Sequence, residues 1–319
     1  MTRTGLLTRL LLVSLALISA RISIGQQSAP VDRWQGADGR YLPFETDEEL
    51  LLFLENAKVV SQKELTGGIN RPLKVRLEQD GLAANAIFRI VDVRHPRAKL
   101  DGKLVMDFHD SYIYECAAYE LSRMLGIDNV PPCVKRTIDH TEGTMQLWIE
   151  GTITEKSRRE DKRKPPMLIH WLRQKQSMLL LDALIYNFDR NQGNMLIDSN
   201  WKLWFIDHTR SFKKSSLVER MEKIIWCERD TWENLLALDR KQLSERLNPY
   251  LTSLQIKMTL KRRDKLVAYL RERIERMGEE AVLYEPSKPA EVSESDLAQF
   301  ELDDEIPEES SRLEEPRNR

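Results

Sequence analysis

Ile185–Phe212, with the sequence IYNFDRNQGNMLIDSNWKLWFIDHTRSF, is the stretch of this 319-residue chain that decides how the rest is interpreted. Two largely apolar segments within it, Met195–Asp198 and Trp201–Ile206, flank Ser199-Asn200. Apolar segments on either side of a short polar pair indicate a tight β-hairpin. We therefore expect a hairpin that holds polar side chains at its open end.

The register of this hairpin predicts which polar groups meet. A two-residue turn pairs Asn194 with Phe205, and Asp207 becomes the diagonal neighbour of Asn194, about 7–8 Å away on the same face. A carboxylate and an amide oxygen at that separation can share a magnesium ion, which prefers hard oxygen ligands. Asp189 comes just before the hairpin, after an apolar helix expected over Met178–Tyr186. The three polar groups are predicted to converge on one pocket, although Asp-Arg-Asn is also common turn chemistry.

Residues 1–25 have the features of a signal peptide. Arg3 and Arg9 precede the apolar run Leu10–Ala20, and small residues that suit a cleavage site follow it. The run is too short for an ordinary membrane-spanning helix. We expect export (secretion, or transfer to a periplasm or secretory lumen), with an uncleaved N-terminal anchor as the alternative and no other transmembrane span.

The rest of the chain has the composition of a folded protein with an acidic tail. Hydrophobic residues make up 41% and charged residues 31%, which suits a two-lobed domain with a sizeable core. Residues 281–319 hold twelve acidic and four basic side chains, a net charge of −8, whereas the formal charge of the whole chain is −2. We expect this tail to be disordered, and residues 26–46 to be a linker.

Cysteine usage and charge patterning exclude several classes of site. Cys116, Cys133 and Cys227 show no CxxC spacing, which argues against structural zinc. We favour three buried thiols, although a disulfide stays open if the chain is exported. The charge run Glu155–Lys164 is interpreted as a solvated loop, and without interleaved aromatic residues it gives no sign of nucleic-acid binding.

The part upstream of the hairpin alternates between strand and helix patterns. A short helix is expected over Asp47–Ala57, followed by strands at Lys58–Lys63, Leu73–Leu77 and Ala83–Val93. Gly67 and Gly68 form either a plain hairpin turn or a loop whose backbone N–H groups can approach phosphates. Arg89 lies in the third of these strands, where it is either a cation that points into a nucleotide cleft or an ordinary surface arginine.

Two further elements complete this region. Asp110–Leu125 is an amphipathic helix in which Glu115 stands beside small residues and can reach inward to a strand cation. Thr144–Gly151 is either a plain core strand or a link between two lobes that offers backbone groups to an adenine edge, with Gln146 and Trp148 as nucleotide-binding residues. Downstream of the hairpin, Ser216–Gly278 is expected to be helical throughout and to serve packing.

In this order, the motifs resemble the atypical kinases of the secretory pathway, of the four-jointed and Golgi casein kinase type. More distantly, they are similar to HipA-like kinases and to phosphatidylinositol 3- and 4-kinases. The resemblance runs from about Leu65 to Phe212. The motifs that carry it are the Gly-Gly turn, Ile87-Phe88-Arg89, Tyr114-Glu115-Cys116-Ala117-Ala118-Tyr119, Val130-Pro131-Pro132, Asp189-Arg190-Asn191-x-x-Asn194 and Ile206-Asp207-His208.

The resemblance implies an α+β, two-lobed protein-kinase-like fold. A small antiparallel-sheet N-lobe with one helix is expected at 47–150 and a mainly helical C-lobe at 151–280. Asp189 becomes the catalytic base, Asn194 and Asp207 the ligands of Mg²⁺ or Mn²⁺, and Glu115 the partner of the nucleotide-binding cation at Arg89. The family pattern has Lys where this chain has Arg89, so Lys74 stays a possible substitute.

The interpretation from sequence is an ATP- and metal-dependent phosphotransferase. Its acceptor is a hydroxyl group on a protein, a sugar or a lipid, and no oligomeric state is indicated. Two alternatives remain open. One is a nucleotide-binding pseudokinase or scaffold, motivated by Arg89, and the other is an exported interaction protein without enzymatic activity.

Overall fold

The computed structural model describes residues 33–65, 72–287 and 306–308. The expected signal peptide, the Gly67-Gly68 turn and most of the acidic tail lie outside the described residues. The elements below belong to the unit Asp32–Arg319.

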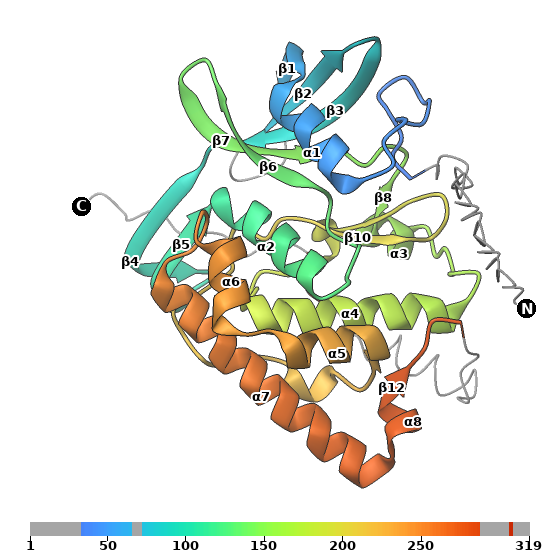
Figure 1. Ribbon diagram of the computed structural model, residues 1–319, viewed down its shortest axis with the longest axis vertical. Coiled ribbons are helices and arrows are strands. Elements are labelled where there is room, and N and C mark those ends of the chain that lie inside the picture. The colour runs from blue at the N-terminus through green and yellow to red at the C-terminus, as the bar shows by residue number, and fades with distance from the viewer. Residues whose placement is uncertain (1–32, 66–71, 288–305, 309–319) are drawn as a thin grey trace, which may run out of the picture. The chain divides into compact units, whose positions relative to one another are not determined.

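A five-stranded antiparallel sheet forms the first half of this unit, in the strand order β1-β2-β3-β7-β6 (Figure 1). Helix α1 (Asp47–Asn56) packs on it. Thr46 begins this helix with a capping box to Glu49, which satisfies backbone N–H groups of the first turn. The strands are β1 (Lys58–Glu64), β2 (Leu73–Gln79), β3 (Leu82–Arg89), β6 (Cys133–Ile138) and β7 (Thr141–Leu147).

The two faces of this sheet differ because side chains alternate along each strand. One face is apolar and packs against α1; its buried residues include Val75, Leu77, Ala86, Phe88 and Met145. The register pairs Lys74 with Ile87 and Ile87 with Gln146, and it pairs Arg89 with Thr144, so these residues share the other face. Polar and charged side chains therefore lie on the face of the sheet opposite α1.

A two-stranded ribbon that the sequence analysis did not anticipate follows β3. The expected strand at Ala83–Val93 ends at Arg89, and a new antiparallel pair begins, β4 (Asp92–Leu100) with β5 (Lys103–Ser111). Ala98, Leu100 and Phe108 bury one side of the ribbon and pack with Phe188. Helix α2 (Ile113–Met124) follows directly, within the helix expected at Asp110–Leu125.

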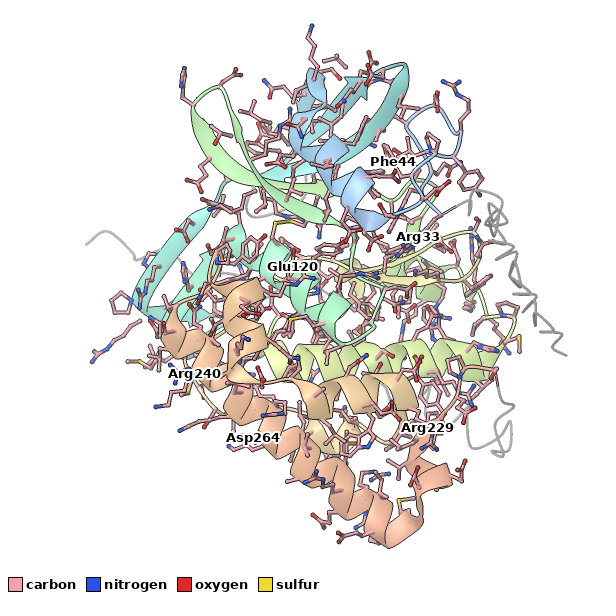
Figure 2. The ribbon with its side chains drawn as sticks, viewed as in Figure 1. Arg33, Phe44, Glu120, Arg229, Arg240 and Asp264 are labelled. Atoms are coloured by element: carbon pink, nitrogen blue, oxygen red, sulfur yellow. A yellow bond between two sulfur atoms is a disulfide. The ribbon has the colours of Figure 1, made fainter. Side chains whose placement is uncertain are left out.

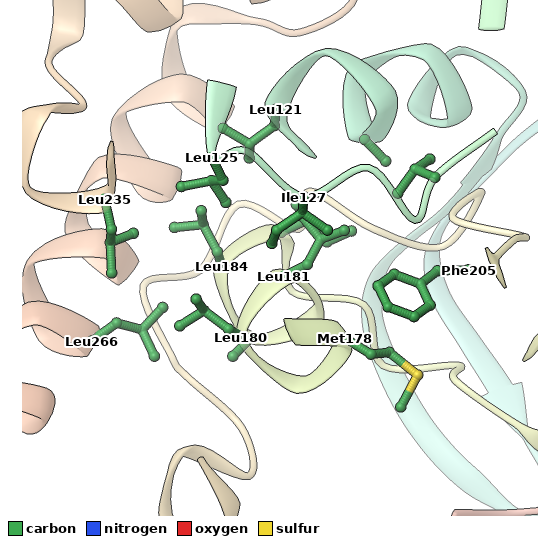
Figure 3. Close-up of a cluster of buried hydrophobic side chains, with 14 of the residues drawn as sticks. Leu121, Leu125, Ile127, Met178, Leu180, Leu181, Leu184, Phe205, Leu235 and Leu266 are labelled. Carbon is green, nitrogen blue, oxygen red and sulfur yellow. The ribbon is translucent and has the colours of Figure 1, made fainter. Parts of the chain in front are cut away.

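The second half is mainly helical, with α4 (Leu168–Ile185) at its centre (Figure 1). Leucines of α4 belong to one buried cluster with Leu121, Leu125, Leu235 and Leu266 (Figure 3). Exposed charged residues such as Arg240 and Asp264 cover the outer surface (Figure 2). The other helices are α3 (Glu155–Glu160), α5 (Arg229–Ala237), α6 (Arg240–Leu247), α7 (Ser253–Met277) and α8 (Glu279–Val282).

Two expectations about the second half are wrong. Ser216–Gly278 is not helical throughout, since its residues before α5 (216–228) form only the 3-10 turn Met221–Lys223 and strand β11 (Cys227–Glu228). Strand β11 pairs with β12 (Leu283–Tyr284). The charge run is not simply a solvated loop. Glu155 is fully buried in α3 and accepts hydrogen bonds from Arg158 and Arg159.

The predicted hairpin is present, but its register differs by one residue. Strand β9 (Met195–Ile197) lies between β8 (Ile153–Thr154) and β10 (Leu203–Phe205), and Phe205 pairs with Met195. The turn has three residues rather than two, because Trp201 adopts a left-handed conformation with φ of +61°. Asn194 therefore lies opposite Ile206, whose N–H donates to the Asn194 carbonyl at 3.2 Å, and not opposite Phe205.

The cysteine expectation is also corrected. Cys116 and Cys133 form a disulfide that joins α2 to β6, and Cys227 is a free, buried thiol as expected. Among the described helices, none combines the length and the apolar character needed to cross a bilayer. The expected α+β class, with an antiparallel sheet before a mainly helical part, is confirmed.

We predict that loss of the Cys116–Cys133 disulfide destabilises the protein. The two cysteines are 17 positions apart in the sequence. In the loop-entropy model, such a cross-link lowers the conformational entropy of the unfolded chain and so stabilises the folded protein by about 3 kcal/mol. Thermal melts of the wild type and of Cys116→Ser/Cys133→Ser measure the effect. Dithiothreitol should lower the melting temperature of the wild type and leave that of the double variant unchanged; an equal response of the two would contradict the assignment.

Candidate functional site

Glu115 is the centre of a buried polar cluster on the face of the sheet opposite α1. Its side chain is fully buried, and it accepts hydrogen bonds from the backbone N–H of His208 at 3.0 Å and from Gln146 Nε2 at 3.3 Å. Arg89 Nε lies 3.7 Å from Glu115 Oε1. Burial alone would raise the pKa of Glu115, but the Arg89 charge and the His208 hydrogen bonds outweigh it and lower that pKa to about 2. Glu115 is therefore an ionised carboxylate that joins α2, β3 and the segment after β10.

A chain of polar contacts continues from Glu115 to α4. His208 Nδ1 lies 3.2 Å from Glu115 Oε2, and its Nε2 lies 3.1 Å from Arg190 Nη2. An arginine can only donate, so His208 Nε2 accepts and the ring proton belongs on Nδ1, where it is donated to Glu115. Arg190 in turn donates to both carboxylate oxygens of Asp182, at 2.8 and 2.9 Å. The buried chain runs Asp182–Arg190–His208–Glu115–Arg89.

Arg190 also fixes the loop that carries the predicted residues. We call Asp189–Asn194 the polar loop. Arg190 Nη1 donates to the carbonyls of Asn194 and Ile206, at 2.7 and 2.8 Å, and so holds the end of the polar loop against the end of β10. Arg190 therefore has a structural part in the motif.

Asn194 and Asp207 are the two residues predicted from the sequence as metal ligands. The buried Asn194 Nδ2 atom has no hydrogen-bond partner within the described part of the chain. Asp207 follows Ile206 with a φ of +59°, a conformation that Asp tolerates better than most residues. Burial, the main cause, raises the pKa of Asp207; the Glu115 and Asp110 carboxylates act in the same direction, while Arg89 and Arg210 oppose them.

Asp189 is held by a cation that the sequence analysis did not single out. Arg210 Nη1 donates to Asp189 Oδ2 at 3.0 Å, and Arg210 Nε donates to Asp110 Oδ2 at 2.8 Å. Asp110 belongs to β5, so Arg210 joins the ribbon to the polar loop. The charges of Asp189 and Asp110 outweigh the effect of burial and raise the pKa of Arg210. This arrangement orients Asp189 beside the ribbon.

The two cations predicted for the nucleotide cleft have different surroundings. Arg89 Nη1 donates to Gln146 Oε1 at 3.1 Å, in addition to its ion pair with Glu115. The Lys74 ammonium lies 3.8 Å from the centre of the Trp148 ring, further along the same face. Arg89, and not Lys74, is thus the ion-pair partner of Glu115.

The structure therefore brings most of the predicted residues to one face of the sheet and the adjoining loop ends. Arg89, Glu115 and Gln146 are in direct contact, Asp207 adjoins His208, and Lys74 stacks on Trp148. Gly67 and Gly68 lie outside the described residues. Sequence reasoning missed Asp182, His208, Arg210 and Asp110. The first three could have been suspected as polar residues in or next to the quoted stretch, but nothing local pointed to Asp110.

The donor set can be compared with the needs of a divalent cation. Within the described residues, no three His, Cys, Asp or Glu side chains converge on a metal position. Asp207 and Asn194 would supply one carboxylate and one amide, which suits Mg²⁺ because it keeps waters and substrate oxygens as its other ligands. The unpaired Asn194 amide fits this assignment, since rotating it by 180° brings its oxygen to the position of the unpaired nitrogen.

Comparisons with known proteins bear on the fold. No protein-family model matches the sequence, and no curated protein matches it either. Solved structures do match. A hydra Fam20 structure with sugar is 17% identical, with a TM-score of 0.58 over 76% of this chain and 93% of the other.

Two Golgi casein kinase structures give the same picture. One is 16% identical with a TM-score of 0.57, over 76% of this chain and 79% of the other. The second, with Mn/ADP bound, is 16% identical with a TM-score of 0.53, over 76% and 80%. Identities this low show the fold alone. The chain therefore has the kinase-like fold of these Fam20 and Golgi casein kinase structures.

Proposed function

We propose that this protein transfers the γ-phosphoryl group of ATP to a hydroxyl acceptor and requires Mg²⁺ or Mn²⁺. The observation that carries the proposal is the buried Glu115–Arg89 ion pair, on a sheet face rich in polar groups. Two further carboxylates belong to adjoining segments, Asp189 in the polar loop and Asp207 after β10. A related fold that is known with Mn/ADP bound supports the choice of nucleotide and metal.

The nucleotide is proposed to lie on the sheet face that carries Arg89 and Lys74. Glu115 and Gln146 fix the Arg89 guanidinium, so its charge is available in one orientation for phosphate oxygens. Lys74 on Trp148 forms a charged, aromatic patch further along the face, which suits a purine and its ribose. Gly67 and Gly68 are proposed to cover the phosphates.

Asp207 and Asn194 are proposed to hold the metal. When bound, the metal neutralises charge on the transferring phosphate oxygens. Asp207 has a raised pKa because burial and neighbouring carboxylates disfavour its ionised form, so a cation there would relieve an existing electrostatic cost. Asn194 contributes an amide that has no partner among the described residues.

Asp189 is proposed as the group that orients the acceptor hydroxyl and accepts its proton. Its hydrogen bond from Arg210 limits its rotation, and the ribbon that carries Asp110 stands beside it. Because the transition state of phosphoryl transfer is loose, positioning and electrostatics carry most of the rate. Because Arg210 joins Asp189 to Asp110 of β5, the β4–β5 ribbon is proposed to border the site where the acceptor binds.

The acceptor is proposed to be a hydroxyl group of a protein, a sugar or a lipid, met after export. The Cys116–Cys133 disulfide supports an oxidising compartment, where such bonds persist. The expected signal peptide gives the route, with an N-terminal anchor as the alternative.

A nucleotide-binding pseudokinase is the second candidate, favoured by one observation. The Arg89 fork already engages both Glu115 and Gln146, so less of it is left for phosphate than a lysine ammonium would offer. ATP binding without transfer to any acceptor would select this candidate, and failure to bind nucleotide at all would favour a non-enzymatic interaction protein.

Replacing Asp189 tests the proposed activity. With [γ-³²P]ATP and Mg²⁺ or Mn²⁺, the wild type should label itself or a protein, sugar or lipid acceptor, and chelation of the metal should abolish labelling. Asp189→Asn should lower the rate by roughly 10²–10⁴-fold, the usual contribution of a general base. The exposed Asp139→Asn serves as the control. Equal rates for the wild type and Asp189→Asn would remove Asp189 from the mechanism.

Replacing Asp207 separates stability from ligand binding. The raised pKa means that the folded protein holds this proton more tightly than the unfolded chain, whose ordinary pKa is 3.8. The ionised carboxylate therefore costs stability as the pH rises from 3.8 through the folded-state pKa, and the cost persists at neutral pH. Asn also tolerates a positive φ.

Asp207→Asn should accordingly melt at or above the temperature of the wild type in metal-free buffer at pH 7. It should lose the stabilisation that Mg-ATP gives the wild type, which differential scanning fluorimetry measures. Equal Mg-ATP shifts in the two proteins would refute the metal role, and a large loss of stability without metal would refute the electrostatic argument.

A further inference from the structure

The acidic C-terminal part of the chain returns to the polar loop. Residues 306–308 are described beside Gln192, which lies between Asp189 and Asn194 in sequence. The Gln192 backbone N–H donates to the Pro307 carbonyl at 2.7 Å, and Gln192 Nε2 donates to the Ile306 carbonyl at 3.0 Å. One residue of the polar loop thus recognises two successive carbonyls of the tail.

Ile306 packs next to the polar loop and forms part of the wall of a groove. Its side chain is 5% exposed and belongs to the main hydrophobic core. The groove leaves a volume of about 250 Å³ beside Ile306. It lies between α4 and the segment before β11, and its lining includes Leu172, Met178, Leu179, Ile225 and Trp226.

Charge complements this apolar contact. Two lysines, Lys175 and Lys223, and one acidic residue, Glu222, also line the groove, so basic residues are in slight excess. The tail sequence on either side of Ile306-Pro307 is Asp303-Asp304-Glu305 and Glu308-Glu309. Ile306 thus has acidic neighbours in the sequence and lies at an apolar groove with a slight excess of basic residues. Proline lacks an N–H group and prefers an extended backbone, which leaves the carbonyls of this segment as its recognition groups.

We infer that this groove is a docking site for a short Ile-Pro segment with acidic flanks, and that residues 306–308 of the same chain are its resident ligand. Docking holds Gln192 and with it the polar loop, to which Asp189 and Asn194 belong. The docking stands without the proposed function, whereas its consequence for catalysis rests on it.

The tether makes occupancy by the chain's own segment favourable. Eighteen residues separate Ser287 from Ile306. A short connection of this kind gives an effective concentration of about 1 mM, so even a segment with weak intrinsic affinity stays docked. An added copy of the segment must compete with this internal one.

The test uses the full chain with Ile306→Asp and a fluorescein-labelled peptide of residues 300–310, FELDDEIPEES. Fluorescence anisotropy should show saturable binding of the peptide to Ile306→Asp. Binding to the wild type should be at least ~10-fold weaker, because the tethered segment competes at its effective concentration. A peptide with Asp in place of its Ile is the matched control and should not bind.

Gln192→Ala in the Ile306→Asp background tests the polar contacts. Loss of the Nε2 donor should weaken peptide binding by roughly 3- to 10-fold, the range for one hydrogen bond. Hydrogen exchange at Asp189–Asn194 should be faster in Ile306→Asp than in the wild type, and the peptide should slow it again.

Two results would overturn the inference. One is a peptide that fails to bind Ile306→Asp, or that binds it equally well with Ile replaced. The other is unchanged exchange in the polar loop. Ile306→Ala, which shortens the same side chain without adding a charge, repeats each measurement if Ile306→Asp does not fold. A wild type without any phosphoryl transfer would refute the proposed function and leave the peptide result as it stands.

Discussion

The structure depends on the burial of one ionised carboxylate, that of Glu115. A buried charge is costly unless it is paired and hydrogen-bonded, and removing a single partner leaves the others uncompensated. Glu115 is satisfied by groups from three separate places, Arg89 on β3, Gln146 on β7 and His208 after β10. These elements must therefore assemble together, and the position of α2 against the sheet is fixed by electrostatics as well as by packing.

The same constraint explains how the second half of the chain contributes to the site. Arg190 donates a hydrogen bond to His208 and forms an ion pair with Asp182 on α4. This buried ion pair anchors the polar loop to the central helix. Apolar side chains of α2 and α4 pack together in the same buried cluster (Figure 3). Within the polar loop, Arg190 has a structural part and stands between Asp189 and Asn194, which are proposed to take part in the chemistry.

Local patterns predicted the elements well and the long-range contacts poorly. Periodicity predicted the α2 helix and the β9–β10 hairpin. The predicted hairpin register was wrong by one residue because Trp201 adopts a left-handed conformation, which is not expected of a tryptophan. The β4–β5 ribbon was missed since its strands are mostly polar and lack an alternating pattern. The contact of Arg210 with Asp110 spans 100 positions, and no local rule reaches that far.

The central claim is that Arg89, oriented by Glu115, is the cation that binds nucleotide phosphates. Calorimetric titration of Mg-ATP into the wild type, Arg89→Met, Glu115→Gln and the double variant tests it most directly. The account predicts that the wild type binds, that each single variant binds at least ~10-fold more weakly, and that the double variant is no weaker than Arg89→Met, because coupled residues are not additive. Unchanged affinity in Arg89→Met, or strictly additive losses, would contradict it.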